Sequence, residues 1–123
     1  WVNAGQAAAD LNSRGIAGAY FRPVYFIPRS SGTGNNRSGK PWDEMCGGVE
    51  IMLTDPAAYR SVEAALHIID AYRKTSPDSL VWSPPVLMRK LNEPGVTVDE
   101  VVKACQDDVK KFMEVRQKYL LYK

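Results

Sequence analysis

A chain of 123 residues is long enough for one domain with its own core, because folding at this size buries roughly two thirds of the unfolded surface. The 16 basic and 14 acidic residues leave a net charge of +2, too small for the strong field of a nucleic-acid-binding protein. Apolar residues make up 45% of the chain, yet no run approaches the ~18 needed to span a bilayer. We therefore expect a single domain over residues 1–123, with no membrane span and no nucleic-acid partner.

The first part of the chain predicts a helix and then a strand. Asn3 can cap a short helix that runs to Arg14, where Gly15 provides a left-handed stop. The apolar residues of this helix recur on one face: Ala4, Ala7, Ala8 and Leu11. Residues 16–28 are rich in aromatic and β-branched side chains, but Pro23 removes a ladder donor in the middle. The pattern predicts either two strand pieces bent at Pro23 or one edge strand.

The stretch CGGVEIMLTD at residues 46–55 predicts a second strand. Val49, Ile51 and Leu53 alternate with Glu50 and Met52, which is the period of a strand with one buried face. The first three are expected to face the core. Asp55 can cap a helical turn that has Pro56 at its first position. A helical turn should therefore follow the strand directly.

The loop before this strand, residues 29–45, is long and polar. It has almost no apolar side chain before Trp42. Its basic residues and its indole ring offer ion pairing and stacking to an anionic sugar or peptide: Arg29, Arg37, Lys40 and Trp42. A loop that only makes the domain soluble is the alternative.

An amphipathic helix is predicted from Ser61 to about Lys74. Its apolar residues recur at helical spacing and are expected to lie on the sheet: Val62, Ala65, Leu66, Ile69 and Tyr72. Four prolines then limit regular structure in residues 75–96 to short pieces, with a short strand at 80–82 as one possibility.

Thr97 and Glu100 predict a capping box at the start of a long C-terminal helix. One face of this helix carries a continuous apolar stripe: Val98, Val101, Val102, Cys105, Val109, Phe112 and Tyr119. Together the elements predict an α+β domain, in which about three helices, including this long one, pack on a short mixed sheet.

The titratable residues provide no complete active site. Cys46 has no orienting partner in the sequence, because the only histidine, His67, lies between apolar residues in the next helix, where a structural or surface role is favoured. One histidine and two cysteines do not provide the four ligands of a typical zinc site. Cys46 and Cys105 are expected to be free thiols. Four clustered acids could serve a glycosidase, but a structural role is favoured for each: Asp43, Glu44, Glu50 and Asp55. We expect no cofactor, no metal and no catalytic residue.

Gly47 and Gly48 permit positive φ or the close approach of another segment. Neither this pair nor the GTG of the preceding loop has the spacing of a phosphate-binding loop. Nucleotide binding is therefore not expected.

Several segments, in this order, resemble one protein family: Trp1-x-Asn3, LNSRGIAGAYFRPVYFIP at 11–28, CGGVEIMLTD at 46–55, AYRSVEAALHIIDAYRKTSPDSLVW at 58–82 and FMEVRQKYLLY at 112–122. They resemble the C-terminal subdomain of the NamZ-type exo-β-N-acetylmuramidases, bacterial proteins formerly grouped under a domain of unknown function. The resemblance covers nearly the whole chain. A chain that begins at Trp1 rather than at a methionine is also expected to be part of a longer protein.

The resemblance implies an extracytoplasmic enzyme that removes N-acetylmuramic acid from the non-reducing ends of peptidoglycan fragments. Its partners would be an N-terminal Rossmann-like domain, which carries the catalytic carboxylate, and a peptidoglycan-derived sugar or muropeptide in a cleft between the two domains. This chain would then be inactive alone. Family motifs and the loop together give the substrate-binding candidates Arg22, Tyr25, Trp42, Cys46, Gly47 and Gly48. The alternative function is a non-catalytic cell-wall binding or domain-docking module.

Overall fold

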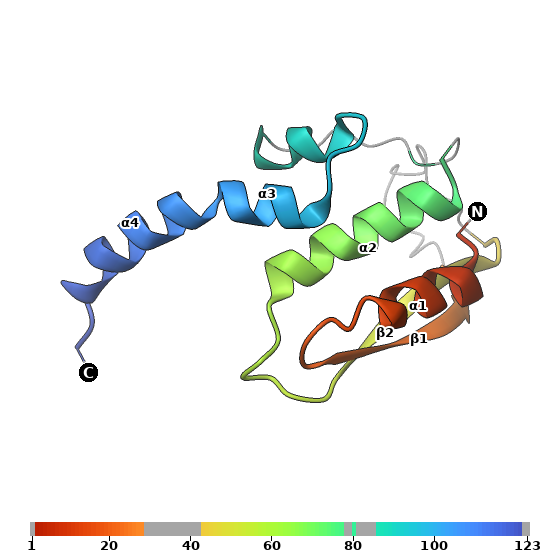
Figure 1. Cartoon of the computed structure of the whole chain (residues 1–123). Coiled ribbons are helices and arrows are strands. Elements are labelled where there is room, and N and C mark those ends of the chain that lie inside the picture. The colour runs from red at the N-terminus through yellow and green to blue at the C-terminus, as the bar shows by residue number, and fades with distance from the viewer. Residues whose placement is uncertain (1, 29–42, 78–79, 81–85, 122–123) are drawn as a thin grey trace. The chain divides into compact units, whose positions relative to one another are not determined.

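The computed structural model describes residues 2–28, 43–77, 80 and 86–121, and the chain divides into two compact units, Trp1–Trp82 and Ser83–Lys123 (Figure 1). The first unit contains two helices and two strands: α1 (Ala4–Ser13), β1 (Ala19–Phe26), β2 (Cys46–Leu53) and α2 (Ser61–Thr75). The second contains a 3-10 helix and two α-helices: η1 (Val86–Asn92), α3 (Val98–Ala104) and α4 (Gln106–Gln117). The predicted α+β class is confirmed.

β1 and β2 form an antiparallel pair, where the sequence predicted a mixed sheet. β1 runs through Pro23 without interruption, so the single edge strand was the correct alternative. Pro23 lies opposite Val49, whose N–H donates to the Tyr72 hydroxyl of α2 at 3.2 Å and so points away from β1. At such a pair the backbone groups of both residues point outward, and the missing N–H of Pro23 therefore costs no ladder hydrogen bond.

Side chains of the two helices cover the outer edges of this sheet. The Asn12 amide of α1 binds Phe21 as a neighbouring strand would: the Phe21 N–H donates to Asn12 Oδ1 at 2.9 Å, and Asn12 Nδ2 donates to the Phe21 carbonyl at 2.8 Å. On the other edge, Tyr72 accepts the Val49 N–H. A two-stranded sheet is marginal alone, and open edges invite pairing with other chains. These bonds fix both helices to the sheet and protect its edges.

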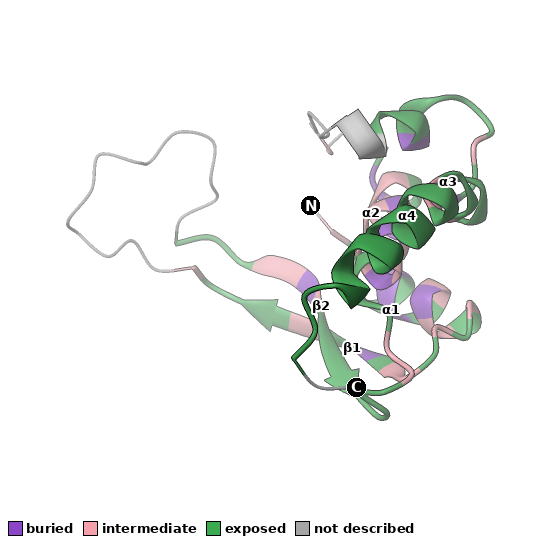
Figure 2. Ribbon diagram, turned by 90° about the vertical axis from the view of Figure 1, so that its left-hand side faces the viewer, coloured by how far each residue is buried: buried purple, intermediate pink, exposed green. Residues whose placement is uncertain are grey.

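The core of the first unit lies where α1 meets the sheet and α2 (Figures 1 and 2). Its buried members are Ala8, Leu11, Phe21 and Ala71. The ends of α1 are as predicted, since the Asn3 side chain accepts the Gln6 N–H at 3.1 Å and Gly15 has a φ of 64°. The small side chains on the buried face of α1 allow the helix to approach the strands closely.

The predicted buried face of β2 is only partly correct. Val49 packs against the core, but Ile51 is 40% exposed and Leu53 is 54% exposed. The reason is the position of α1, which packs mainly on β1. Phe21, directly opposite Ile51 in the register, is only 1% exposed and binds Asn12 of α1. The β2 side of this part of the sheet is therefore left less covered than the β1 side.

The buried face of α2 is also rotated relative to the predicted stripe. Its buried residues are Ala64, Leu66, Asp70 and Ala71, while Val62 is 60% exposed. α2 packs beside α1, which is lined with alanines, and small residues at that contact allow the two helices to come close. Asp55 caps a separate turn before α2, because its Oδ1 accepts the N–H groups of Ala57 and Ala58.

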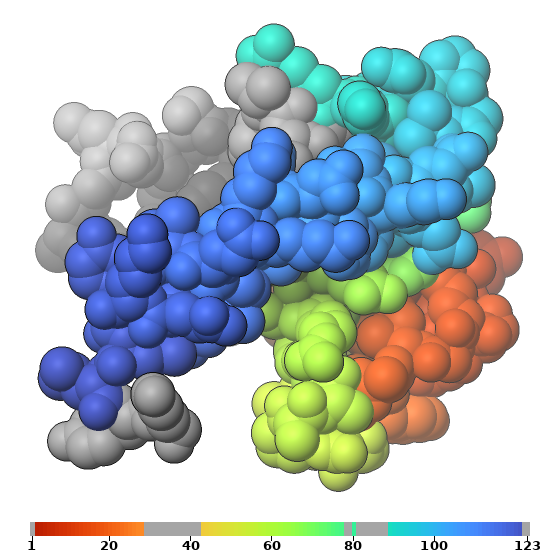
Figure 3. Space-filling view, turned by 60° about the vertical axis from the view of Figure 1, so that its left-hand side comes forward, coloured from red at the N-terminus to blue at the C-terminus, as the bar shows by residue number. Residues whose placement is uncertain are grey.

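The predicted long C-terminal helix is divided at Cys105 into α3 and α4. The capping box is confirmed, with the Thr97 N–H donating to Glu100 and the Glu100 N–H to Thr97. Cys105 ends α3 because its N–H donates to the Val102 carbonyl, three residues back, in 3-10 fashion. α4 has no buried residue, and its exposed side chains are drawn in blue in Figure 3.

η1 fits the expected short structure of the proline-rich stretch, but Val81 and Trp82 of the predicted strand at 80–82 lie outside the described residues. Among the residues that the structure describes, no helix has both the length and the apolar character needed to cross a membrane.

Candidate functional site

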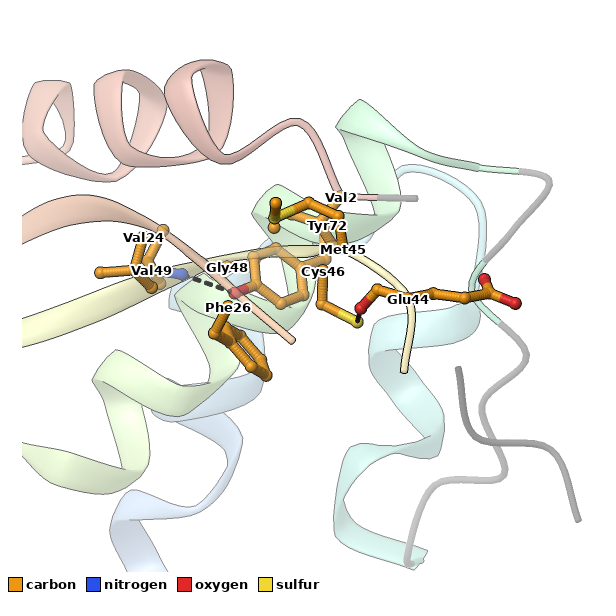
Figure 4. A pocket seen from close by; sticks show the side chains of 10 residues that line it. Val2, Val24, Phe26, Glu44, Met45, Cys46, Gly48, Val49 and Tyr72 are labelled. Carbon is orange, nitrogen blue, oxygen red and sulfur yellow. Dashed lines mark hydrogen bonds between the residues drawn. The ribbon is translucent and has the colours of Figure 1, made fainter. Parts of the chain in front are cut away.

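A pocket of about 560 Å³ opens at the end of the sheet where β1 ends and β2 begins (Figure 4). This volume is within the range of small-molecule sites. The N-terminal segment contributes Val2 to its walls, β1 contributes Val24 and Phe26, and α2 contributes Tyr72. Residues 44–49 complete the lining. Four segments that are distant in the sequence thus meet around one cavity.

The two glycines of this pocket have different roles. A Cβ on Gly47 would lie 2.4 Å from the Val2 carbonyl oxygen, closer than a real side chain can come. A Cβ on Gly48 would instead meet the side chains of Phe26, Tyr72 and Val24 at 3.6 to 3.9 Å, which is ordinary van der Waals contact. Position 47 must therefore be glycine because the backbone of the N-terminal segment passes directly against it. Gly48 has no such backbone neighbour and leaves space inside the pocket.

We expect Gly47→Ala to destabilise the domain by about 2–3 kcal/mol, because the new methyl group must displace the backbone at Val2. Gly48→Ala is the matched control and should cost less than about 1 kcal/mol, since its methyl group meets only side chains at normal distances. Urea unfolding followed by circular dichroism measures both. Equal losses in the two variants would contradict this assignment.

The polar groups of the pocket are few (Figure 4). Burial raises the pKa of Tyr72, and the hydrogen bond from Val49 opposes this only in part, so the phenol is neutral at pH 7. Cys46 Sγ lies 3.7 Å from the Glu44 carbonyl oxygen, to which it donates. Glu44 is the one carboxylate, and there is no cation, among the described residues that line the pocket. The site is therefore mainly apolar, with a slight negative charge.

The structure does not pair Cys46 with His67. His67 Nδ1 lies 3.2 Å from Arg14 Nη1, and because arginine only donates, this ring nitrogen is the acceptor. His67 is not among the lining residues of the pocket. This contact agrees with the structural role favoured from the sequence. Cys46 and Cys105 are not joined in a disulfide, and the described residues include no group of three or more possible metal ligands.

Two of the sequence candidates lie outside the pocket. Arg22 faces Glu50 across the sheet, with Arg22 Nε donating to Glu50 Oε2 at 2.7 Å in an exposed ion pair. Tyr25 lies opposite Gly47 in the register but is 65% exposed and does not line the cavity. Trp42 lies outside the described residues.

The remaining candidates, Cys46, Gly47 and Gly48, do meet in the pocket. Sequence reasoning did not single out Val2, Phe26 or Tyr72 as members of a site. Phe26 belongs to the family-like segment at 11–28, which was the available signal for it. Tyr72 belongs to an apolar stripe and to the family-like segment at 58–82, so its hydroxyl and that resemblance were the available signals for it.

Comparison with known proteins agrees with the sequence resemblance. Residues 1–122 match the family model described as Exo-beta-N-acetylmuramidase NamZ, C-terminal. The chain is 23% identical, over 131 residues, to the Peptidoglycan beta-N-acetylmuramidase NamZ of Bacillus subtilis (strain 168), an alignment that covers 99% of the chain and 30% of that protein.

The fold is similar to the crystal structure of a DUF1343 family protein from Bacteroides fragilis, with a TM-score of 0.80 and 22% identity. That similarity covers 100% of this chain and 34% of the other. The chain thus spans about a third of the length of each of these two proteins. Because the family model matches almost every residue, the chain belongs to the family of NamZ C-terminal domains.

Proposed function

We propose that this chain is the C-terminal domain of a peptidoglycan exo-β-N-acetylmuramidase, that its pocket forms part of one wall of the substrate cleft, and that it is inactive alone. The carrying observation is that Glu44 is the only carboxylate among the described residues of the pocket. Glycoside hydrolysis commonly uses two carboxyl groups about 5–10 Å apart. A pocket with one such group is suited to binding, and the chemistry must come from elsewhere.

Four other acids of the first unit have structural partners. Asp55 caps the turn before α2, and Glu50 pairs with Arg22 on the sheet surface. Asp10 and Asp70 both bind Arg14. These contacts support a division of labour in which another part of the protein supplies the catalytic carboxylate.

The partner in this proposal is an N-terminal Rossmann-like domain that precedes this chain. The chain spans 30% and 34% of the two relatives, which leaves room for such a domain. Tyr20 and Met52 lie opposite each other in the register, on the same face as Phe26 of the pocket, and all three are exposed. The exposed Arg22–Glu50 pair lies between them on this face, and a surface that mixes apolar and charged groups suits docking against another domain of the same protein. In this proposal the enzyme acts outside the cytoplasm, where peptidoglycan lies.

The test compares this chain with its longer parent protein on a chromogenic β-glycoside of N-acetylmuramic acid. The parent should release the chromophore and the 123-residue chain should release none. Turnover by the chain alone, or an inactive parent, would contradict the proposal. Binding of the chain to purified peptidoglycan without hydrolysis by the parent would favour a non-catalytic cell-wall module instead.

A further inference from the structure

We infer that the pocket at the junction of β1 and β2 binds the acetamido group of an N-acetylated sugar and excludes the substrate's carboxylate. This inference rests on the proposed function, since that function provides an amino sugar as the ligand. It adds which part of the sugar enters the pocket and which residues determine this.

Charge is the first argument. Glu44 is the only formal charge among the described lining residues, and it is negative. None of these residues offers a cation to a carboxylate that leaves water for this site, and the Glu44 carboxylate itself points away from Phe26 and Tyr72 (Figure 4). We expect an acidic substituent of the sugar to stay in water.

The apolar walls are the second argument. Side chains of Phe26 and Val24 from β1 and of Tyr72 from α2 surround Gly48, each 3.6 to 3.9 Å from the position of a Cβ on that glycine (Figure 4). Such a surface offers too few donors and acceptors for the several hydroxyl groups of a sugar ring. It suits a small, mainly apolar group.

The backbone provides the third argument. The Val49 N–H points away from β1, so the ladder alternation turns the amide groups of Gly47 toward the same outer edge of β2. Peptide groups at a strand edge bind a secondary amide in the way they bind a neighbouring strand. An acetamido group combines this amide with one methyl group, which distinguishes it from a hydroxyl and from a carboxylate.

The test is a titration of the 15N-labelled chain, followed by the amide resonances of Gly47, Gly48 and Val49. Methyl β-N-acetylglucosaminide should shift these resonances with a millimolar Kd, whereas methyl β-glucoside should not. N-acetylmuramic acid should bind about as well as the neutral acetamido sugar, because its carboxylate stays in water. Equal binding of the glucoside would overturn the inference, as would binding of a sugar-free alanine-containing stem peptide without binding of the acetamido sugar.

Gly48→Ala puts a methyl group in the proposed acetamido site and should weaken binding at least 10-fold while the spectrum stays that of a folded chain. Gly5→Ala in α1 is the control, since its added methyl group lies near Asn3 and outside the pocket, and it should bind normally. Unchanged binding by Gly48→Ala would overturn the inference. An unchanged KM of the longer parent enzyme after Gly48→Ala would also overturn the inference. Because that parent would still be active, the proposed function would stand.

Discussion

Gly18→Ala is expected to destabilise the domain by about 2–5 kcal/mol, the largest loss expected for a methyl group added at any of the glycines that the structure describes. Gly18 has a φ of 73°, where an L-residue is strained. Its Cβ would also lie 2.2 Å from the Asp55 carbonyl oxygen and 2.8 Å from the Tyr59 nitrogen, and both atoms belong to the backbone. The Gly18 carbonyl oxygen accepts the Thr54 N–H. The turn after β2 therefore cannot move away from Gly18 without losing this hydrogen bond.

Gly15→Ala separates the two causes of that loss. Gly15 has a similar φ of 64°, but no atom lies within 4 Å of the Cβ position. Gly15→Ala should lower the free energy of unfolding only by the strain of the left-handed conformation, about 1–2 kcal/mol. Chemical denaturation of the two variants under identical conditions gives the comparison. Similar midpoints would mean that the close approach at Gly18 is not important for stability.

Asp70→Asn is expected to cost about 2–4 kcal/mol. Asp70 is only 7% exposed, and its Oδ2 lies 2.8 Å from Arg14 Nη1 and 2.8 Å from Lys74 Nζ. Arg14 belongs to the end of α1 and is itself largely buried, so loss of the carboxylate leaves its charge without this partner. Asp108→Asn is the control, because its pair with Lys111 is solvent-exposed, and it should change stability by less than about 0.5 kcal/mol.

The same carboxylate should make stability depend on pH. Burial alone would raise the pKa of Asp70, but the hydrogen bonds and positive charges of Lys74 and Arg14 outweigh it and hold the pKa below its usual value. The stabilisation is then complete above the unfolded pKa of about 3.9 and is lost as the pH falls through the lower folded value. Urea midpoints measured from neutral to acid pH should fall less in Asp70→Asn than in the wild type. Parallel curves would contradict this role.

The local features of the fold could be predicted because their causes lie within a few residues. The Asn3 cap, the Gly15 stop, the Asp55 turn and the box of Thr97 with Glu100 each depend on hydrogen bonds between near neighbours. The features that were predicted wrongly depend on distant contacts. Ile51 and Leu53 have a strand pattern, but the packing of α1 mainly on β1 leaves them exposed.

The candidate site shows the same division. Gly47 and Gly48 could be singled out as residues that permit a close approach, but the sequence could not say that Val2 approaches one and Tyr72 the other. Tyr72 joins the pocket because its hydroxyl reaches from α2 to the Val49 N–H at the edge of β2, which is a tertiary contact. Arg22 was a reasonable binding candidate until the register placed Glu50 directly opposite it.

The pairing of Asn12 with both backbone groups of Phe21 also fixes the alignment of β1 on α1. A slip of β1 by one residue would turn the inward side chains out and present to Asn12 a residue whose N–H and carbonyl point the other way. A slip by two residues toward the C-terminus would bring Pro23, which has no N–H to donate. A single side chain of α1 thus selects which residues of β1 face the core and which face outward.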